Sequence, residues 1–249
     1  MANFEWQPSI VPPIGIEMSR EQQLACAFRI LDANGFSENI AGHITWTDRD
    51  DGSMLVNPWG LWWTEMTASD VCRVSADGRV IEGRWDVTPA VHIHTEIHRA
   101  HPDAKIVIHN HPYWVTVLAS LGELPEIFHQ TGCLFHEEMI FVDEYDGTIE
   151  DAESGAALAR AIDGHCVSVL ANHGVIVTGD TLLEAVYRAA SFERQCKLAY
   201  DVLLTGRTLR PVPRDAREET HDVLVERAPE IYWGGAVRQL LRTDPDVLK

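Results

Sequence analysis

Apolar residues along this chain recur with two spacings, one typical of helices and one typical of strands. Intervals of three and four residues, which place side chains on one face of a helix, begin after Ser19 and end at Asn34-Gly35. Ser19, followed three residues later by Gln22, is typical of a capping box at the start of a helix. A second helix is predicted from a Thr88 cap and Pro89 in the first turn to Ala100. Similar patterns predict helices at 112–121, 151–161, 182–204, 214–227 and 232–241.

Short runs of apolar and β-branched residues, bounded by turn residues, predict the strands. They lie at 44–47, 54–57, 71–74, 79–82, 106–111 and 166–171, with turns at 48–53 and at Asp77-Gly78. Strands and helices alternate without strict βαβ regularity, which predicts one α/β domain with a mixed or antiparallel sheet. We expect an irregular arm at 1–18 and the domain at 19–206. A helical extension at 207–249 is expected to pack on the domain or on a neighbouring subunit.

Two of the predicted strands carry histidines at their ends. His109 and His111 are two residues apart on the strand at 106–111, so both side chains point the same way. The strand at 166–171 ends in Asn172, His173 and a glycine, which repeats the arrangement. Two such strand ends can bring three neutral nitrogens around one ion and leave positions open for substrate or water. We therefore predict that His109, His111 and His173 hold a catalytic metal.

Composition narrows the range of partners. The 249 residues carry a formal net charge of −18, which argues against nucleic acid and anionic membrane surfaces as partners. A small anionic substrate stays open, because a bound cation can reverse the charge locally. The five cysteines are scattered without a C-x-x-C pair, which favours a reducing cytoplasm over a disulfide framework. No secretory leader or stretch long enough to cross a membrane is expected.

The motifs resemble those of the class II aldolase/adducin family in order and spacing, over roughly residues 20–205. The matching segments are Asn39–His43, Val56–Gly60, Ala100–Asp103, the H-N-H strand and Asn172–Gly174. The resemblance implies a three-layer α/β/α domain with a central mixed or antiparallel sheet. It also implies a homotetramer with active sites at subunit interfaces, and one divalent ion (Zn²⁺, Mn²⁺ or Fe²⁺) per subunit on His109, His111 and His173.

The departures from the family pattern concern substrate and proton transfer. Sugar-phosphate aldolases of this family place an acid/base glutamate at the start of the helix before the metal strand, where this chain has Ala90. Their phosphate pocket corresponds here to positions that hold His43, Trp59, Thr88 and Pro89, which offer less space and fewer donors. The resemblance therefore implies an unphosphorylated substrate, with contacts expected from Gly42, His43, Trp59 and Gln130.

A histidine could replace the missing carboxylate. The loop at 125–132 corresponds to the family segment that supplies a tyrosine to the active site, and that position is His129 here. An imidazole can act as acid or base near neutral pH, so His129 is the predicted catalytic residue. The alternative is that His129 only packs in the loop or at a subunit interface.

Three functions remain open on this basis. The first is a metal-dependent carbon–carbon lyase that decarboxylates or cleaves a small oxo or hydroxy acid, or an aromatic hydroxy-carboxylate, through a metal-stabilised enolate. The second is a non-haem Fe(II) dioxygenase on the same three histidines, as in relatives of the pyruvic oxime dioxygenase and decarboxylating-oxygenase kind. The third is an adducin-like interaction module, against which the histidine trio counts.

Overall fold

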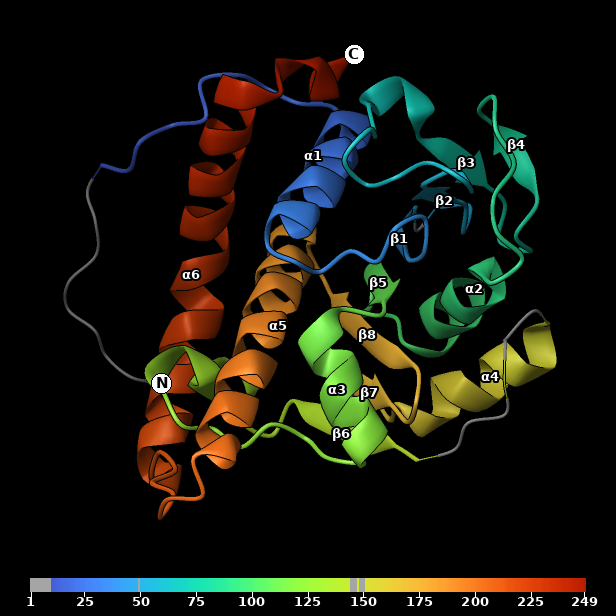
Figure 1. Cartoon of the computed structure of the whole chain (residues 1–249). Helices are drawn as coiled ribbons and strands as arrows, with labels where there is room; N and C mark the ends of the chain where they lie inside the picture. Colours follow the sequence, from blue (N-terminus) through green and yellow to red (C-terminus); the bar gives the residue numbers. More distant parts are fainter. Residues whose placement is uncertain (1–9, 49, 144–146, 148–150) are drawn as a thin grey trace.

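A mixed eight-stranded sheet forms the centre of the computed structural model, which describes residues 10–48, 50–143, 147 and 151–249 (Figure 1). The strand order is β4-β3-β2-β1-β5-β8-β7-β6, and only the β6–β7 pair is parallel among the neighbouring pairs. The strands are β1 (His43–Thr47), β2 (Met54–Val56), β3 (Cys72–Val74), β4 (Val80–Glu82), β5 (Ile106–Asn110), β6 (Met139–Val142), β7 (Val167–Leu170) and β8 (Gly174–Gly179).

Helices cover both faces of this sheet (Figure 1). They are α1 (Arg20–Ala33), α2 (Val91–Ala100), α3 (Tyr113–Leu121), α4 (Ala152–Ala161), α5 (Leu182–Leu204) and α6 (Arg214–Thr243), with short 3₁₀ turns η1 (Ala68–Asp70), η2 (Gln130–Phe135) and η3 (Pro245–Leu248). On β5, Ile106 and Ile108 belong to the core under α1, α3, α5 and α6. Val107 points to the opposite face and packs in the core under α2 and α4. The predicted three-layer α/β/α domain with a mixed sheet is confirmed.

Local signals located several elements correctly. Ser19 and Gln22 form the predicted capping box at the start of α1. Residues 10–19 contain no helix or strand, whereas the first nine residues of the predicted arm lie outside the described part of the chain. No helix in the described residues combines the length and apolar character required to cross a bilayer.

Three predictions differ from the structure. The two short helices predicted around Pro229 are one continuous helix, α6, because burial of Trp233 and Val237 outweighs the loss of one backbone donor. The helix predicted from Thr88 begins at Val91, where Thr88 Oγ1 accepts a hydrogen bond from the Ala90 amide instead of capping the helix. Strands β6 and β8 were not predicted.

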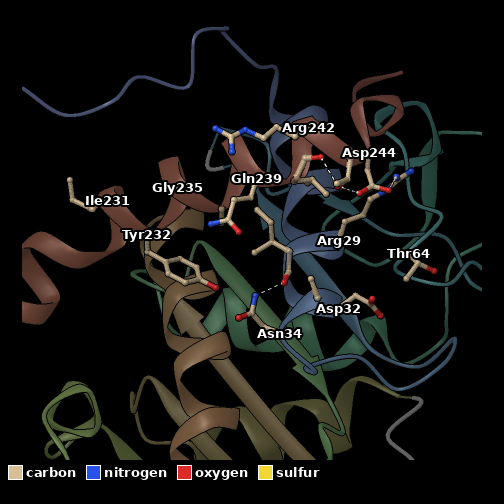
Figure 2. A pocket seen from close by; sticks show the side chains of 15 residues that line it. Arg29, Asp32, Asn34, Thr64, Ile231, Tyr232, Gly235, Gln239, Arg242 and Asp244 are labelled. Atoms are coloured by element: carbon tan, nitrogen blue, oxygen red, sulfur yellow. Dashed lines mark hydrogen bonds and ion pairs between the residues drawn. The ribbon is translucent and has the colours of Figure 1, made fainter.

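Helix α6 and the end of α1 line an open pocket of about 800 Å³ (Figure 2). Arg29 is buried at its edge and forms ion pairs with Asp246 at 2.9 Å and Asp244 at 3.7 Å. Tyr232 lies at the pocket wall and packs on Tyr187 with ring centroids 5.2 Å apart. Burial raises the pKa of the Tyr232 hydroxyl to about 12. Most of its lining residues belong to α1 and α6, and none of the predicted site residues is among them.

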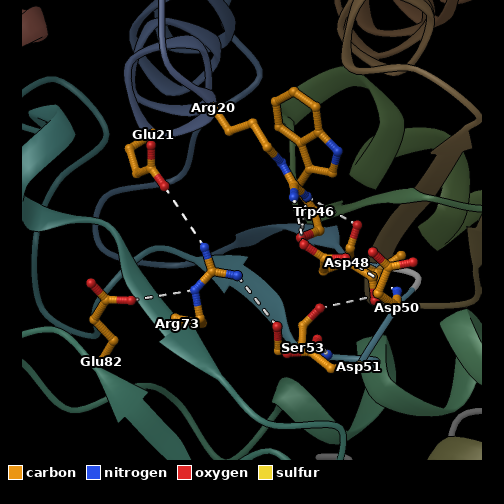
Figure 3. Close-up of polar contacts among 10 residues, drawn as sticks. Arg20, Glu21, Trp46, Asp48, Asp50, Asp51, Ser53, Arg73 and Glu82 are labelled. Carbon is orange, nitrogen blue, oxygen red and sulfur yellow. Dashed lines mark hydrogen bonds and ion pairs between the residues drawn. The ribbon is translucent and has the colours of Figure 1, made fainter.

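A polar network holds the start of α1 against the first strands (Figure 3). Arg20 lies over the ring of Trp46 at 4.6 Å and pairs with Asp48 at 3.1 Å. Arg73 donates to Ser53 Oγ at 3.3 Å, and its guanidinium also lies near two glutamates of α1 and β4. Such exposed pairs contribute about 0–1 kcal/mol each, so their effect is mainly to fix where α1 begins relative to the β1–β2 hairpin.

Candidate metal centre

The three predicted ligands lie together at one end of β5. His109 is on the strand itself, His111 follows its last residue, and His173 is in the tight turn between β7 and β8. Because β8 pairs with β5, with Val175 opposite Asn110, the turn brings His173 beside the other two. The imidazole nitrogens that could bind an ion all lie within 4.8 Å of one another. Ring centroids are 4.8 Å apart for His109–His173 and for His111–His173, and 5.1 Å apart for His109–His111.

Hydrogen bonds orient two of these rings. His109 Nδ1 donates to the Val175 carbonyl at 3.0 Å, which leaves Nε2 as the free nitrogen. His111 Nδ1 is 2.6 Å from Glu38 Oε2, and its Nε2 is buried without a hydrogen-bond partner. A metal-binding histidine commonly holds a carbonyl or carboxylate with its other nitrogen in this way. The residues therefore fit a divalent cation.

Burial favours the neutral form of His109 and His173, which is the form that binds a metal. Burial lowers the pKa of His109 well below its usual range, and the nearby imidazoles of His173 and His111 lower it further. Burial lowers the pKa of His173 to about 4, with His111 contributing in the same direction. An unprotonated nitrogen is the ligand that binds a metal ion, so no proton must be displaced from these rings near pH 7.

Close backbone packing fixes the segments that carry the ligands. A Cβ atom on Gly174 would lie 2.4 Å from the Asn110 carbonyl, so only glycine allows the β7–β8 turn to approach β5 this closely. Glu193 of α5 accepts hydrogen bonds from the amides of Trp114 and Val115 at 3.0 and 3.1 Å. This carboxylate caps the first turn of α3, which begins two residues after His111, and thereby helps to fix the chain at the end of β5.

Two of the predicted substrate residues lie on β1 or beside it. His43 is opposite His109 in the β1–β5 register, with ring centroids 5.9 Å apart, and burial lowers its pKa to about 4. Gly42 has φ +87°, and a Cβ atom there would meet the Asn110 side chain at 2.5 Å. The structure therefore gives Gly42 a packing role beside β5, and places His43 next to His109, one of the three predicted ligands.

Further histidines extend from His43 along the α2 side of the sheet. His94 of α2 is fully buried, with its ring centroid 5.6 Å from that of His43. Thr45 Oγ1 lies between His94 Nδ1 at 2.8 Å and His98 Nε2 at 2.7 Å. Ala90 is one helical turn before His94 and so lies on the same side of α2. Burial lowers the pKa of His94 well below its usual range, which fits a packed neutral ring.

The other predicted residues lie further out. Trp59 is 66% exposed after β2, and its amide donates to the Asp86 carbonyl at 2.9 Å. His129 precedes η2, which packs on α5 and α6, and Gln130 is the exposed first residue of η2. Burial, together with the positive charge of Arg194, lowers the pKa of His129. Within one chain, neither His129 nor Gln130 lines the pocket at the three histidines.

That pocket has a volume of about 800 Å³ and lies between the α1–β1 loop, α3 and α5. Glu38, His111 and His173 line the end of the pocket at the histidine cluster. Glu38 and the α3 wall were not predicted from the sequence, because nothing local distinguishes Glu38 from other surface glutamates. The remaining lining residues are Gly35, Ser37, Tyr113, Thr116, Val117, Ser120, Leu121, Asn172 and Tyr200.

Comparisons with known proteins agree with this fold. The profile of the family described as Class II Aldolase and Adducin N-terminal domain matches residues 22–200. An L-fuculose 1-phosphate aldolase from Glaciozyma antarctica PI12 superimposes with a TM-score of 0.81 at 25% identity, covering 98% of this chain and 97% of that one.

Two bacterial relatives are similar in sequence. A 4-hydroxy-3-prenylphenylpyruvate oxygenase/4-hydroxy-3-prenylbenzoate synthase of Streptomyces roseochromogenus subsp. oscitans is 31% identical over 167 residues, which is 66% of this chain and 60% of the relative. Decarboxylase NovR of Streptomyces niveus is 31% identical over 167 residues, covering 66% of this chain and 62% of the relative. The chain thus matches about three-fifths of the length of these two proteins.

Proposed function

The chain belongs to the class II aldolase and adducin family, and from this premise we propose that it is a divalent-metal-dependent carbon–carbon lyase. The substrate is a small unphosphorylated oxo or hydroxy acid, or an aromatic hydroxy-carboxylate, which undergoes decarboxylation or retro-aldol cleavage. The observation that carries the proposal is the convergence of His109, His111 and His173, of which His111 and His173 line the end of a pocket. A pure interaction module has no use for this arrangement.

The three histidines determine which chemistry the bound ion could perform. A divalent ion, Zn²⁺, Mn²⁺ or Fe²⁺, would be held by the three imidazoles and would supply Lewis-acid charge to an oxyanion developing on the substrate. The Val175 carbonyl and Glu38 keep two of the rings turned toward that position. With three protein ligands, coordination positions remain for a chelating acid.

The nature of the pocket supports an unphosphorylated and partly apolar substrate. Tyr113 and Tyr200 provide aromatic surface, and Val117 and Leu121 add apolar surface. The pocket contains hydroxyl groups but no lysine or arginine among its lining residues in the described chain, so a phosphate would find no cation there other than the metal. Ala90 supplies no carboxylate from α2. Both observations argue against sugar phosphates.

Additional contacts are proposed from a second subunit. In a homotetramer, which we propose from the family, His129 of one chain would reach the metal centre of its neighbour as acid or base, and Gln130 would hold a substrate oxygen. Gly42, His43 and Trp59 would contact the substrate from the α2 side. All five cysteines are free thiols, which supports a reducing, cytoplasmic location.

The second candidate is an Fe(II) dioxygenase that uses the same three histidines. The specific observation in its favour is the 31% identity to a protein named an oxygenase of a prenylated phenylpyruvate. Both candidates share the three-histidine site, the pocket and an acidic substrate class, so they differ in metal identity and in the need for O₂.

One experiment separates them. The protein is purified without oxygen, its metal is determined by elemental analysis, and a panel of 2-oxo, 2-hydroxy and aromatic hydroxy acids is incubated under argon and under air. The lyase proposal expects product and CO₂, or an aldehyde or ketone, under argon, with loss of activity in His109→Ala. Turnover that requires both O₂ and iron would reject the lyase proposal and support the dioxygenase. Full activity in the His109→Ala protein would reject both.

A further inference from the structure

We propose that Glu38 is a positioning residue of the metal centre, which holds the His111 imidazole in its metal-binding orientation. The inference rests on the proposed metal-dependent function and adds a carboxylate contributed by the α1–β1 loop. Glu38 lines a pocket with residues of α3 and α5, whereas Ala90, which supplies no carboxylate, packs against the core under α2 and α4.

The contact between the two residues is short and directional. Glu38 Oε2 lies 2.6 Å from His111 Nδ1, slightly closer than the distance of about 2.7–2.9 Å typical of a charge-assisted N–H···O hydrogen bond. The Nδ1–H donates to the carboxylate, so the lone pair is on Nε2, which is buried and has no hydrogen-bond partner. Nε2 is therefore the atom that converges with the nitrogens of His109 and His173. A carboxylate on the far nitrogen also makes an imidazole a stronger metal ligand.

The backbone around Glu38 is fixed on both sides, although its side chain is 49% exposed. Asn39 has φ +41°, and its side-chain oxygen accepts a hydrogen bond from the Ile40 amide at 2.7 Å. The Ala41 amide donates to the Glu38 carbonyl at 2.9 Å, closing a tight turn. On the other side, the Ser37 hydroxyl donates to the Asp32 carboxylate. The turn thus presents Glu38 in one place instead of leaving it on a mobile surface loop.

The two oriented ligands are held by different kinds of group. The partner of His109 is the Val175 carbonyl, a backbone atom in the middle of the sheet that substitution cannot remove. The partner of His111 is a side chain at the metal end of the pocket, close enough that its charge also acts on His173. Glu38 can therefore be changed without altering a ligand or the sheet, which makes its contribution measurable.

The test is metal affinity of the full chain, measured without any substrate. Metal-free protein is titrated with Co²⁺, followed by its visible absorption, and with Zn²⁺ in competition with a chelator of known affinity. Glu38→Gln keeps an acceptor and removes the charge, whereas Glu38→Ala removes both. We expect metal affinity to fall by about 10–100-fold, more in Ala than in Gln, the usual range for losing such a partner. The Co²⁺ absorption at saturation should change as well, because the His111 ring is less well oriented.

A matched control is available in Glu138, whose carboxylate pairs with His221 Nε2 at 3.3 Å in another part of the chain. Glu138→Gln removes a histidine-paired glutamate without approaching the three histidines, and should leave both metal affinities unchanged. The melting temperature of each metal-free variant is measured in parallel.

The possible results separate the inference from the function on which it rests. If the Glu38 variants bind Co²⁺ as tightly as the wild type while His111→Ala loses the metal, the role of Glu38 is rejected. The assignment of the metal centre is unaffected by that result. Retention of the metal by His111→Ala would reject the centre itself. A lowered melting temperature in Glu38→Gln with an unchanged Co²⁺ spectrum at saturation would show that Glu38 only supports the loop, which also overturns the inference.

Discussion

Binding of one divalent ion should raise the melting temperature of this protein, because the three histidines come from two separate segments of the sheet. His109 and His111 belong to β5 and its end, whereas His173 belongs to the β7–β8 turn. An ion held by all three ties these segments together only in the folded state. Its binding energy is then added to the free energy of unfolding.

The size of the effect follows from mass action. At a free metal concentration 100 times the dissociation constant, the added stability is about 2.7 kcal/mol. For a domain of this size, about 1 kcal/mol corresponds to a shift of about 2–4 °C in melting temperature. We therefore expect an increase of about 5–11 °C when chelator-treated protein is saturated with Zn²⁺.

Thermal unfolding followed by circular dichroism measures this shift, in wild type and in two histidine variants. His173→Ala removes a partly buried ligand on the turn, and its melting temperature should not respond to Zn²⁺. His165→Ala is the matched control, because His165 is also partly buried and its Nδ1 donates to the nearby Ile162 carbonyl at 3.1 Å, outside the group of three histidines. It should keep the full increase. A wild-type protein indifferent to Zn²⁺, or an equal increase in His173→Ala, would refute the assignment of the ligands.

Four further predictions follow from the structure. Gly42→Ala should lower the free energy of unfolding by about 1–3 kcal/mol in chemical denaturation, because a methyl group would strain a left-handed backbone and strike Asn110. The Glu138 contact raises the pKa of His221, and the His221 contact lowers the pKa of Glu138. The Glu138–His221 pair should therefore make its full contribution to the free energy of unfolding, about 0.2–1 kcal/mol, between pH 4.5 and 6.5. This contribution should decrease below and above that pH range, as measured by comparing denaturant titrations of the wild type and His221→Gln. His129→Gln should lower turnover by about 10²–10⁴-fold if it is the acid or base, with metal content unchanged; near-normal turnover would remove it from the mechanism. Fuculose 1-phosphate should not be cleaved at rates in the ordinary enzyme range of about 1–10³ per second, measured by coupled assay.

Elements whose signals are contained in a short segment could be predicted from the sequence. The capping box of α1 needs only Ser19 and Gln22, and the H-x-H pair needs only the alternation of one strand. Strand β8 was missed because the apolar run Gly174–Gly179 follows a tight turn and has no alternating pattern, since it is buried on both faces in the middle of the sheet. The helix boundary at Pro229 was wrong for a related reason. Burial of side chains on the same helix outweighs a local breaker, and burial is not visible in the local sequence.

Residues that act through contacts distant in sequence could not be predicted in the same way. Glu38 and His111 are 73 positions apart, and no local pattern marks the glutamate as the partner of a histidine. The pocket wall likewise combines α3 with Tyr200 of α5. The roles proposed for His129 and Gln130 depend on how two subunits pack together, and the local sequence pattern of one chain contains no signal for that packing.

The placement of the carboxylate bears on the type of reaction. A carboxylate on α2 at the position of Ala90 would be free to exchange protons with a substrate, whereas Glu38 is engaged with His111 Nδ1 at 2.6 Å. A carboxylate that accepts a hydrogen bond from one nitrogen of a metal-binding histidine orients that ring. It is therefore poorly placed to remove a proton from the substrate at the same time. Retro-aldol cleavage must begin by deprotonating a hydroxyl group, but decarboxylation begins with the loss of CO₂ and needs no base for that step. The arrangement of Ala90 and Glu38 therefore favours decarboxylation within the proposed lyase function. After CO₂ has left, the product must take up a proton, and His129 of a neighbouring subunit, or water, would supply it.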